Sequence, residues 1–132
     1  MALDMQVKQI MRRDFVQADA EESLGGARET MRLGRIRHLL VTRGDALLGV
    51  LSYRDLLEWL LVDTPQQGRA ERLRISDLMR EKPACISPEA TLAEAADRMC
   101  RYGYGCLPVT SDAGHLVGVL TETDLLRAAY GL

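Results

Sequence analysis

A nine-residue segment that occurs twice constrains the fold of this chain more than any other feature. Residues 49–57 read GVLSYRDLL and residues 118–126 read GVLTETDLL, so six of the nine positions are identical. The similarity continues upstream, where Ile10-Met11-Arg12 aligns with Leu78-Met79-Arg80 at a shift of 68 residues. One residue is inserted at 111–115, and the shift is 69 from there on. A repeat of about half the chain length predicts two copies of one folding unit.

Composition limits the class of protein. The chain has 132 residues, of which 47% are hydrophobic, and a net charge of −2. A chain of this size can bury an ordinary apolar core, and the near-neutral charge argues against general nucleic-acid binding. The longest apolar stretch, residues 56–62, is interrupted by Glu58 and is far shorter than the ~20 residues of a membrane span. The first ten residues lack the pattern of a secretory signal. We therefore expect a cytoplasmic, soluble protein that contacts neither membrane nor nucleic acid.

Local patterns predict the same order of elements in both halves: strand, helix, strand, strand, helix. In the first half the strands are expected at 15–18, 39–42 and 46–51, with helices from Ser23 and Ser52. In the second half they are expected at 84–86, 106–110 and 116–120, with helices from Thr91 and Thr121. Short helices are expected to lead into both halves. The predicted fold class is α/β (α+β), with two β-α-β-β-α repeats related by pseudo-two-fold symmetry. The repeats are placed at 7–63 and 73–130, joined by a polar linker at 64–72.

This order of elements, together with Gly-apolar-apolar-Ser/Thr-x-x-Asp at the end of each copy, resembles a tandem pair of cystathionine β-synthase (CBS) domains, the Bateman module. The segments 37–41 and 106–109 resemble the family's Leu-Pro-Val strand, although Leu40 replaces the usual proline in the first copy. The resemblance covers nearly the whole chain. It implies a regulatory module that senses AMP, ADP, ATP or S-adenosylmethionine in the cleft between its repeats. It also implies an unidentified attached or separate protein that the module regulates, and no required cofactor.

The repeated motif has a physical logic of its own. Ser52 is placed as the N-cap of a helix and Asp55 three residues later. A helix N-terminus has unpaired N–H groups and partial positive charge, which suit a phosphate. A carboxylate in the first turn can accept two hydrogen bonds from ribose hydroxyls, and a preceding glycine permits close approach of backbone or ligand. By the resemblance, the candidates for ribose and phosphate binding are Ser52, Asp55, Thr121, Asp124, Gly49 and Gly118.

A simpler interpretation explains the same motif. Ser-x-x-Asp and Thr-x-x-Asp are helix-capping patterns, each worth about 1 kcal/mol without any ligand. An aspartate turned inward to cap its helix is less free to hold ribose, so the two interpretations compete. By the resemblance, the segments around Val16, Ala18, Ala84 and Ile86 flank adenine.

The two halves differ in positive charge. Arginine is the natural clamp for phosphate, and Arg37, His38 and Arg54 are the phosphate candidates of the first half. Most of the equivalent second-half positions are neutral. Arg28, Arg32 and Arg35 share one helical face, which is either a phosphate-binding face or a solvated one. We therefore predict unequal sites, with polyphosphates favoured in the first half.

The predicted helix at the end of each repeat is a candidate dimer interface. Residues 56–62 form an unusually apolar helix, which either packs inside the chain or forms a homodimer through Leu56–Val62 and Leu125–Tyr130, as the resemblance implies. Neither a catalytic residue set nor metal-ligand spacing is present, and the three cysteines form no CxxC pair. Three functions remain: a ligand-sensing module, a ligand-free structural dimerisation module and, least favoured, a small enzyme.

Overall fold

The computed structural model describes residues 2–62, 68 and 72–131. The chain divides into two compact units. We call Val16–Lys82 the middle unit, and Met1–Phe15 together with Pro83–Leu132 the terminal unit. Of the linker predicted at 64–72, only residues 68 and 72 lie within the described part of the chain.

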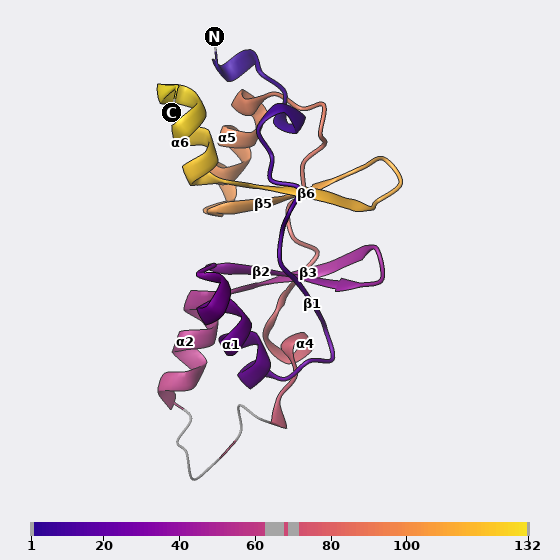
Figure 1. The fold of residues 1–132 in the computed structure, drawn as a ribbon, viewed down its shortest axis with the longest axis vertical. Coiled ribbons are helices and arrows are strands. Elements are labelled where there is room, and N and C mark those ends of the chain that lie inside the picture. Colours follow the sequence, from indigo (N-terminus) through magenta and orange to yellow (C-terminus); the bar gives the residue numbers. More distant parts are fainter. Residues whose placement is uncertain (1, 63–67, 69–71, 132) are drawn as a thin grey trace. The chain divides into compact units, whose positions relative to one another are not determined.

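The middle unit is built on a four-stranded sheet with the order β1-β2-β3-β4. β1 and β2 are parallel, and the other neighbouring strands are antiparallel. Helices α1 and α2 lie on the same face of this sheet (Figure 1). The elements are β1 (Gln17–Asp19), α1 (Leu24–Gly34), β2 (His38–Arg43), β3 (Ala46–Ser52), α2 (Tyr53–Val62), α4 (Ile75–Leu78) and β4 (Arg80–Glu81).

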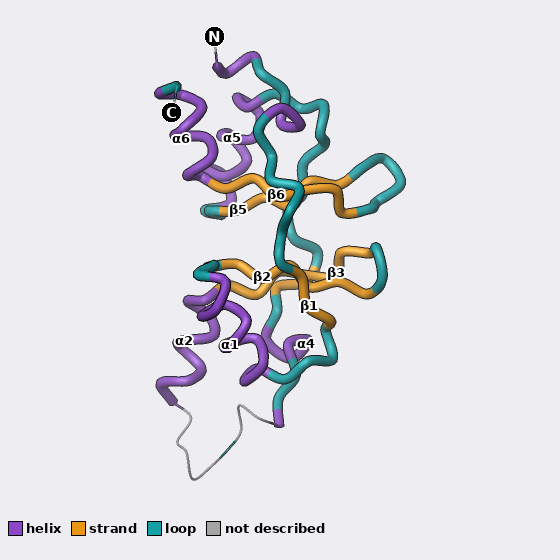
Figure 2. Tube along the Cα trace, viewed as in Figure 1, coloured by secondary structure: helices purple, strands orange, loops and turns teal. Residues whose placement is uncertain are grey.

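The terminal unit contains the antiparallel pair β5-β6. Isolated bridges flank this pair: Ile86 pairs in parallel with Val109, and Arg12 pairs antiparallel with Val119. By the repeat shifts these bridges correspond to β1 and β4 of the middle unit, so the terminal unit repeats the same plan (Figure 2). The elements are η1 (Ala2–Asp4), η2 (Val7–Gln9), α5 (Leu92–Tyr102), β5 (Cys106–Thr110), β6 (Leu116–Thr121) and α6 (Glu122–Tyr130).

Each unit has its own hydrophobic core. The buried residues of α1 and of α5 recur at helical spacing, so they form one stripe that faces the strands. The core of the middle unit includes Leu24, Ala27, Met31, Leu39 and Val41. The core of the terminal unit includes Leu92, Ala95, Met99, Leu107 and Val109. The α+β class predicted from the sequence is confirmed.

The segments that lead into the two repeats are exchanged between the units. Val7 is fully buried in the core of the terminal unit, and Ile75 is fully buried in the core of the middle unit. Each compact unit therefore combines most of one sequence repeat with the lead-in of the other. β4 was not predicted from the sequence; it is only two residues long and belongs to the second lead-in.

Two predicted strands differ in extent from the observed ones. β1 begins at Gln17 rather than Phe15, because the chain crosses from one unit to the other between Phe15 and Val16. The strand expected at 84–86 reduces to a single bridge at Ile86, whose N–H donates to the carbonyl of Pro108 (3.0 Å). Pro108 has no N–H to extend the ladder toward residue 84. In the middle unit Leu40 takes this place, and it pairs with Gln17.

Candidate functional site

The junction between β6 and α6 carries the repeated motif of the terminal unit. Thr121 Oγ1 accepts the N–H of Asp124 (3.3 Å), and Asp124 Oδ2 accepts the N–H of Thr121 (2.9 Å). These two bonds form a capping box, which satisfies two N–H groups at the start of the helix. The side chain of Asp124 is only 8% exposed. Asp124 therefore caps its helix, as the simpler interpretation of the motif requires.

A residue from the first lead-in completes this junction. Arg12 Nε donates to Asp124 Oδ1 at 3.1 Å, so both oxygens of the carboxylate have a partner. The backbone holds Arg12 in place, because its N–H and carbonyl both bond Val119 at 2.9 Å.

The junction between β3 and α2 in the middle unit also has a hydroxyl cap and an arginine on its aspartate. Ser52 Oγ accepts the N–H of Asp55 (3.1 Å), which confirms Ser52 as a cap. Arg80 Nε donates to Asp55 Oδ2 at 3.2 Å, and Arg80 pairs with Val50 as part of β4. The side chain of Asp55 is 22% exposed and thus more accessible than that of Asp124.

The two lead-in arginines were not predicted to belong to these junctions. The predicted cations lie close to each motif in the chain, whereas Arg12 lies 112 residues before Asp124. A signal was present, because the repeat aligns Met11-Arg12 with Met79-Arg80. The terminal unit, expected to be mostly neutral, therefore has an arginine at its junction too.

Gly49 and Gly118 allow the lead-ins to approach these junctions. A Cβ at Gly49 would lie 2.6 Å from the carbonyl oxygen of Arg80, and one at Gly118 would lie 2.9 Å from that of Arg12. Both distances are too short for any side chain other than hydrogen. The close approach expected at these glycines is made by backbone, and contact with a ligand there stays a prediction.

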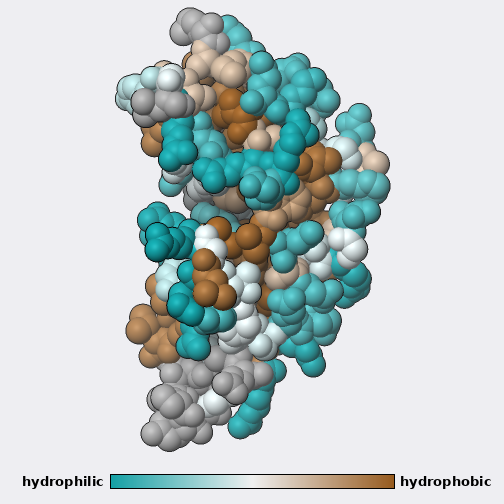
Figure 3. Space-filling view, viewed as in Figure 1, coloured by the Kyte–Doolittle hydropathy of each residue, from teal (hydrophilic) through white to brown (hydrophobic). Residues whose placement is uncertain are grey.

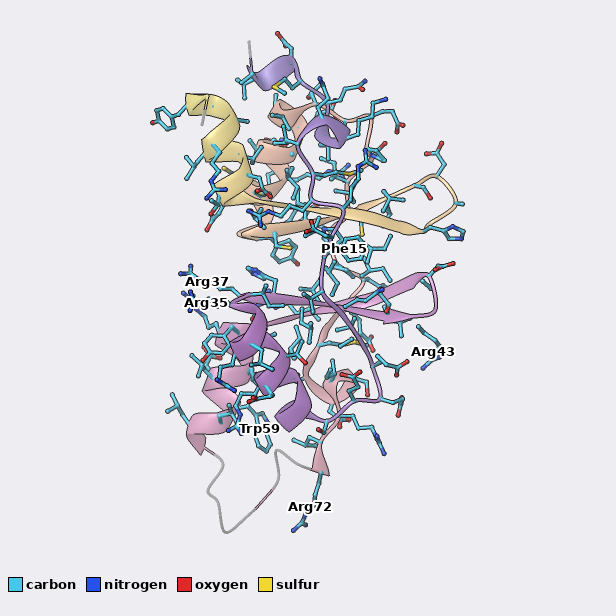
Figure 4. All side chains as sticks on the ribbon, in the orientation of Figure 1. Phe15, Arg35, Arg37, Arg43, Trp59 and Arg72 are labelled. Atoms are coloured by element: carbon cyan, nitrogen blue, oxygen red, sulfur yellow. The ribbon has the colours of Figure 1, made fainter. Side chains whose placement is uncertain are left out.

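The phosphate candidates of the first half cluster beside the Ser52 junction. His38 pairs with Ser52 across β2 and β3, and the N–H of Tyr53 donates to the carbonyl of Arg37 (2.7 Å). Arg54 lies exposed in the first turn of α2. Figure 4 shows Arg35 and Arg37 at the same edge of the middle unit, with Arg43 at the other end of β2.

The terminal unit has uncharged residues at the equivalent positions. Cys106 pairs with Thr121, and the N–H of Glu122 donates to the carbonyl of Gly105 (3.1 Å). Gly105 and Cys106 thus take the places of Arg37 and His38. The difference in charge predicted from the sequence is therefore present beside the strand-to-helix junctions.

The helical face of Arg28, Arg32 and Arg35 is largely solvated. Arg32 forms an exposed ion pair with Glu29, one turn earlier in α1. This contact lowers the pKa of Glu29 and raises that of Arg32. Arg35 is the C-cap of α1, in a left-handed conformation (φ 51°) that is uncommon outside glycine.

The four residues expected to flank adenine divide into two kinds. Ala18 and Ile86 are buried in the two hydrophobic cores. Val16 is 38% exposed and Ala84 is half-buried. Val16 and Ala84 thus have accessible side chains, whereas the backbone N–H and carbonyl of Ile86 are already bonded to Pro108 and Thr110; contact of any of the four with adenine stays a prediction.

The cysteines differ in accessibility. Burial, and secondarily the charge of Asp124, raises the pKa of the Cys106 thiol to about 12. Burial also raises the pKa of Cys85, while Cys100 is exposed. Thiols with raised pKa values are poor nucleophiles at neutral pH, so Cys85 and Cys106 suit packing rather than nucleophilic chemistry. Among the described residues, no three His, Cys, Asp or Glu side chains gather as metal ligands.

Comparison with known proteins identifies the family. A family model of the CBS domain matches residues 7–62 and 75–131, and the chain therefore belongs to the CBS domain family. A CBS domain-containing protein of Dictyostelium discoideum is 32% identical across 91% of this chain and 88% of its own length. The inosine-5'-monophosphate dehydrogenase of Korarchaeum cryptofilum is 34% identical across 86% of this chain, which spans 22% of that enzyme.

A solved structure supports the same assignment. CBSX2 of Arabidopsis thaliana in complex with AMP matches with a TM-score of 0.83 and 25% identity, over 96% of both chains. Within the described part of this chain, no helix combines the length and apolar character that crossing a membrane requires.

Proposed function

We propose that this chain is a regulatory module that senses adenosine-containing ligands, AMP, ADP, ATP or S-adenosylmethionine, at its two strand-to-helix junctions. The observation that carries the proposal is the duplicated junction itself. Each copy brings a helix N-terminus, a hydroxyl cap, an aspartate and an arginine together in a chain of the CBS family. The AMP bound by CBSX2 supports an adenosine ligand here.

Each junction offers groups for two parts of a nucleotide. The N–H groups at the start of α2 and α6, with Ser52 and Thr121, suit a phosphate. A carboxylate has about four lone-pair sites, so Asp55 and Asp124 can accept ribose hydroxyls. Regulation of an attached or separate protein is the proposed output, and similarity to a short part of a much longer enzyme supports it.

Titration calorimetry with AMP tests the proposal directly. The variant Asp55→Asn with Asp124→Asn should weaken AMP at least roughly tenfold, because each ribose loses a charged acceptor. The amide oxygen of Asn can still accept the N–H of Thr121, so the cap and the fold should persist. The matched control is Asp45→Asn with Asp112→Asn, which removes the same charge from two exposed hairpin turns.

The same measurements distinguish a ligand-sensing module from a ligand-free structural module. Unchanged affinity in the Asp55/Asp124 variant would show that ribose is not held there. A wild-type protein whose melting temperature responds to none of the four ligands would exclude the sensing function, because a ligand at 100 times its dissociation constant adds about 2.7 kcal/mol.

An exposed apolar stripe favours a second, structural function. Leu57 and Leu61 of α2 are 40% and 84% exposed, and the repeat-equivalent Leu126 and Tyr130 of α6 are 58% and 76% exposed. Figure 3 shows apolar side chains at the surface over α2. Exposed apolar side chains that form a contiguous patch mark interaction sites, and Leu57 and Leu61 lie one turn apart on α2.

We therefore also propose a homodimer through Leu56–Val62 and Leu125–Tyr130. Light scattering at tens of micromolar should give twice the monomer mass. The variant Leu61→Glu with Tyr130→Glu should be monomeric, while Leu33→Glu, at a 70% exposed leucine of α1, should leave the mass unchanged. A monomeric wild-type protein would rule out this assembly.

A further inference from the structure

Each aspartate proposed to hold ribose already has a guanidinium partner, and the two partners are repeat equivalents. Arg12 Nε lies 3.1 Å from Asp124 Oδ1, and Arg80 Nε lies 3.2 Å from Asp55 Oδ2. The arginines are 68 positions apart and the aspartates 69, which are the two shifts of the repeat. The pairing is thus a feature of the folding unit, built twice.

Strand pairing holds the backbone of each arginine in place, while its side chain stays accessible. Arg12 is bonded to Val119 through both of its backbone groups, and Arg80 pairs with Val50. The side chains of Arg12 and Arg80 are nevertheless 50% and 58% exposed. Each guanidinium can therefore exchange its partner while the backbone stays in place.

Ribose and arginine compete for the same carboxylate. Asp124 is 8% exposed, with one oxygen on the N–H of Thr121 and the other on Arg12. Each oxygen keeps a lone pair, but with the carboxylate so little exposed, we infer that a ribose diol reaches Asp124 by displacing the half-exposed side chain of Arg12. A neutral nucleoside would leave that guanidinium without its carboxylate, whereas a nucleoside phosphate supplies a new anion that suits the guanidinium fork.

We propose that Arg12 and Arg80 select nucleoside 5'-phosphates over neutral nucleosides by partner exchange. The ribose replaces the arginine on the aspartate, and the phosphate replaces the aspartate on the arginine. This inference rests on the proposed function of the two junctions. It assigns a role to two residues that were not among the predicted phosphate candidates Arg37, His38 and Arg54.

Titration calorimetry with AMP and adenosine measures this selectivity. The wild-type protein should prefer AMP over adenosine by roughly ten- to a hundredfold, which is the range expected for a charge-assisted hydrogen bond. In the variant Arg12→Met with Arg80→Met, the affinity for AMP should fall. The affinity for adenosine should stay the same or rise. The ratio of the two affinities should therefore fall by about tenfold.

A matched variant separates this effect from the loss of positive charge. Arg13→Met with Arg43→Met removes two exposed arginines outside the junctions and should keep the wild-type ratio. If the methionine variant does not fold, as judged by circular dichroism, Arg12→Lys with Arg80→Lys keeps the charge but loses the planar fork. That variant should also reduce the ratio.

The outcomes distinguish the two proposals. An unchanged ratio of AMP to adenosine affinity in the folded Arg12/Arg80 variant would overturn partner exchange and leave the ligand-sensing function intact. An equal fall in the Arg13/Arg43 control would also overturn it, because net charge would then be the cause. A wild-type protein that binds neither compound would overturn partner exchange, whereas the sensing function would fall only if ADP, ATP and S-adenosylmethionine also failed to bind.

Discussion

A single methyl group at Gly49 should separate the second lead-in from the sheet of the middle unit. In Gly49→Ala the new Cβ would lie 2.6 Å from the carbonyl oxygen of Arg80 and 2.9 Å from Met79 Sδ. The methionine side chain can turn away, but the carbonyl belongs to the backbone of β4. Ordinary contact begins at 3.4 Å, so β4 must move by about 0.8 Å.

The cost of this movement can be estimated from its parts. Overpacking typically costs about 1–3 kcal/mol, and weakening the β3–β4 pairing costs about 1 kcal/mol for each hydrogen bond lost. The lower entropy of alanine in the unfolded chain offsets about 0.4–1 kcal/mol. We expect a net loss of about 1–4 kcal/mol in the free energy of unfolding, or a melting temperature lower by roughly 5–15 °C.

Urea unfolding followed by the fluorescence of Trp59, the single tryptophan, measures this loss in the middle unit. Gly25→Ala is the matched control, because a Cβ there meets nothing closer than Ser23 Oγ at 3.9 Å. It lies in α1 and should stabilise the unit by up to about 1 kcal/mol. The reasoning would be refuted if Gly49→Ala were as stable as the wild type, or if both variants shifted stability in the same direction.

Three further predictions concern the thiols, the phosphate candidates and the caps. At pH 8 a thiol reagent should label Cys100 first and Cys106 only on unfolding. Because the pKa of Cys106 is raised from 9.0 to about 12, the contribution of the neutral Cys106 thiol to the free energy of unfolding should be complete below pH 9 and lost as the pH rises toward 12. Arg37→Ala with Arg54→Ala should weaken ATP and ADP more than AMP, by roughly tenfold in calorimetry, and an unchanged ratio would contradict the predicted polyphosphate preference. Thr121→Ala should lower the free energy of unfolding in urea by about 1 kcal/mol, and a change below about 0.5 kcal/mol would mean that the cap contributes little.

The sequence was most informative where structure is determined locally. Ser23 and Thr91 were expected to begin helices, and each accepts the backbone N–H of the residue three positions later. The helices that follow have buried stripes at the predicted spacing. These elements could be predicted because caps and apolar periodicity act within one or two turns, and because the repeat displayed each pattern twice.

The exchange of lead-ins could not be predicted in the same way. The short segments at 7–12 and 75–80 are compatible with either repeat, because each carries only one or two core residues. Their placement is decided by pairing over long distances in the chain, as between Arg12 and Val119. The Arg12–Asp124 pair was missed for this reason, although both residues belong to aligned parts of the repeat.

The structure also changes how the two interpretations of the repeated motif relate. Capping and ribose binding were expected to compete for each aspartate. In Asp124, however, the cap uses Oδ2 and Arg12 uses Oδ1. The cap holds the carboxylate in one orientation, so in the proposed exchange the ligand displaces the arginine and leaves the helix cap in place.

The same reasoning predicts an order of binding at the two junctions. Asp55 is 22% exposed and has Arg37 and His38 beside its junction, whereas Asp124 is 8% exposed and has Gly105 and Cys106 at the equivalent positions. A nucleotide bound at Asp55 would therefore lie near more positively charged side chains than one bound at Asp124. It would also bind a carboxylate that is already more exposed. We therefore expect the middle unit to bind first, and the preference to increase with the number of phosphates, because only there does additional negative charge meet additional arginine.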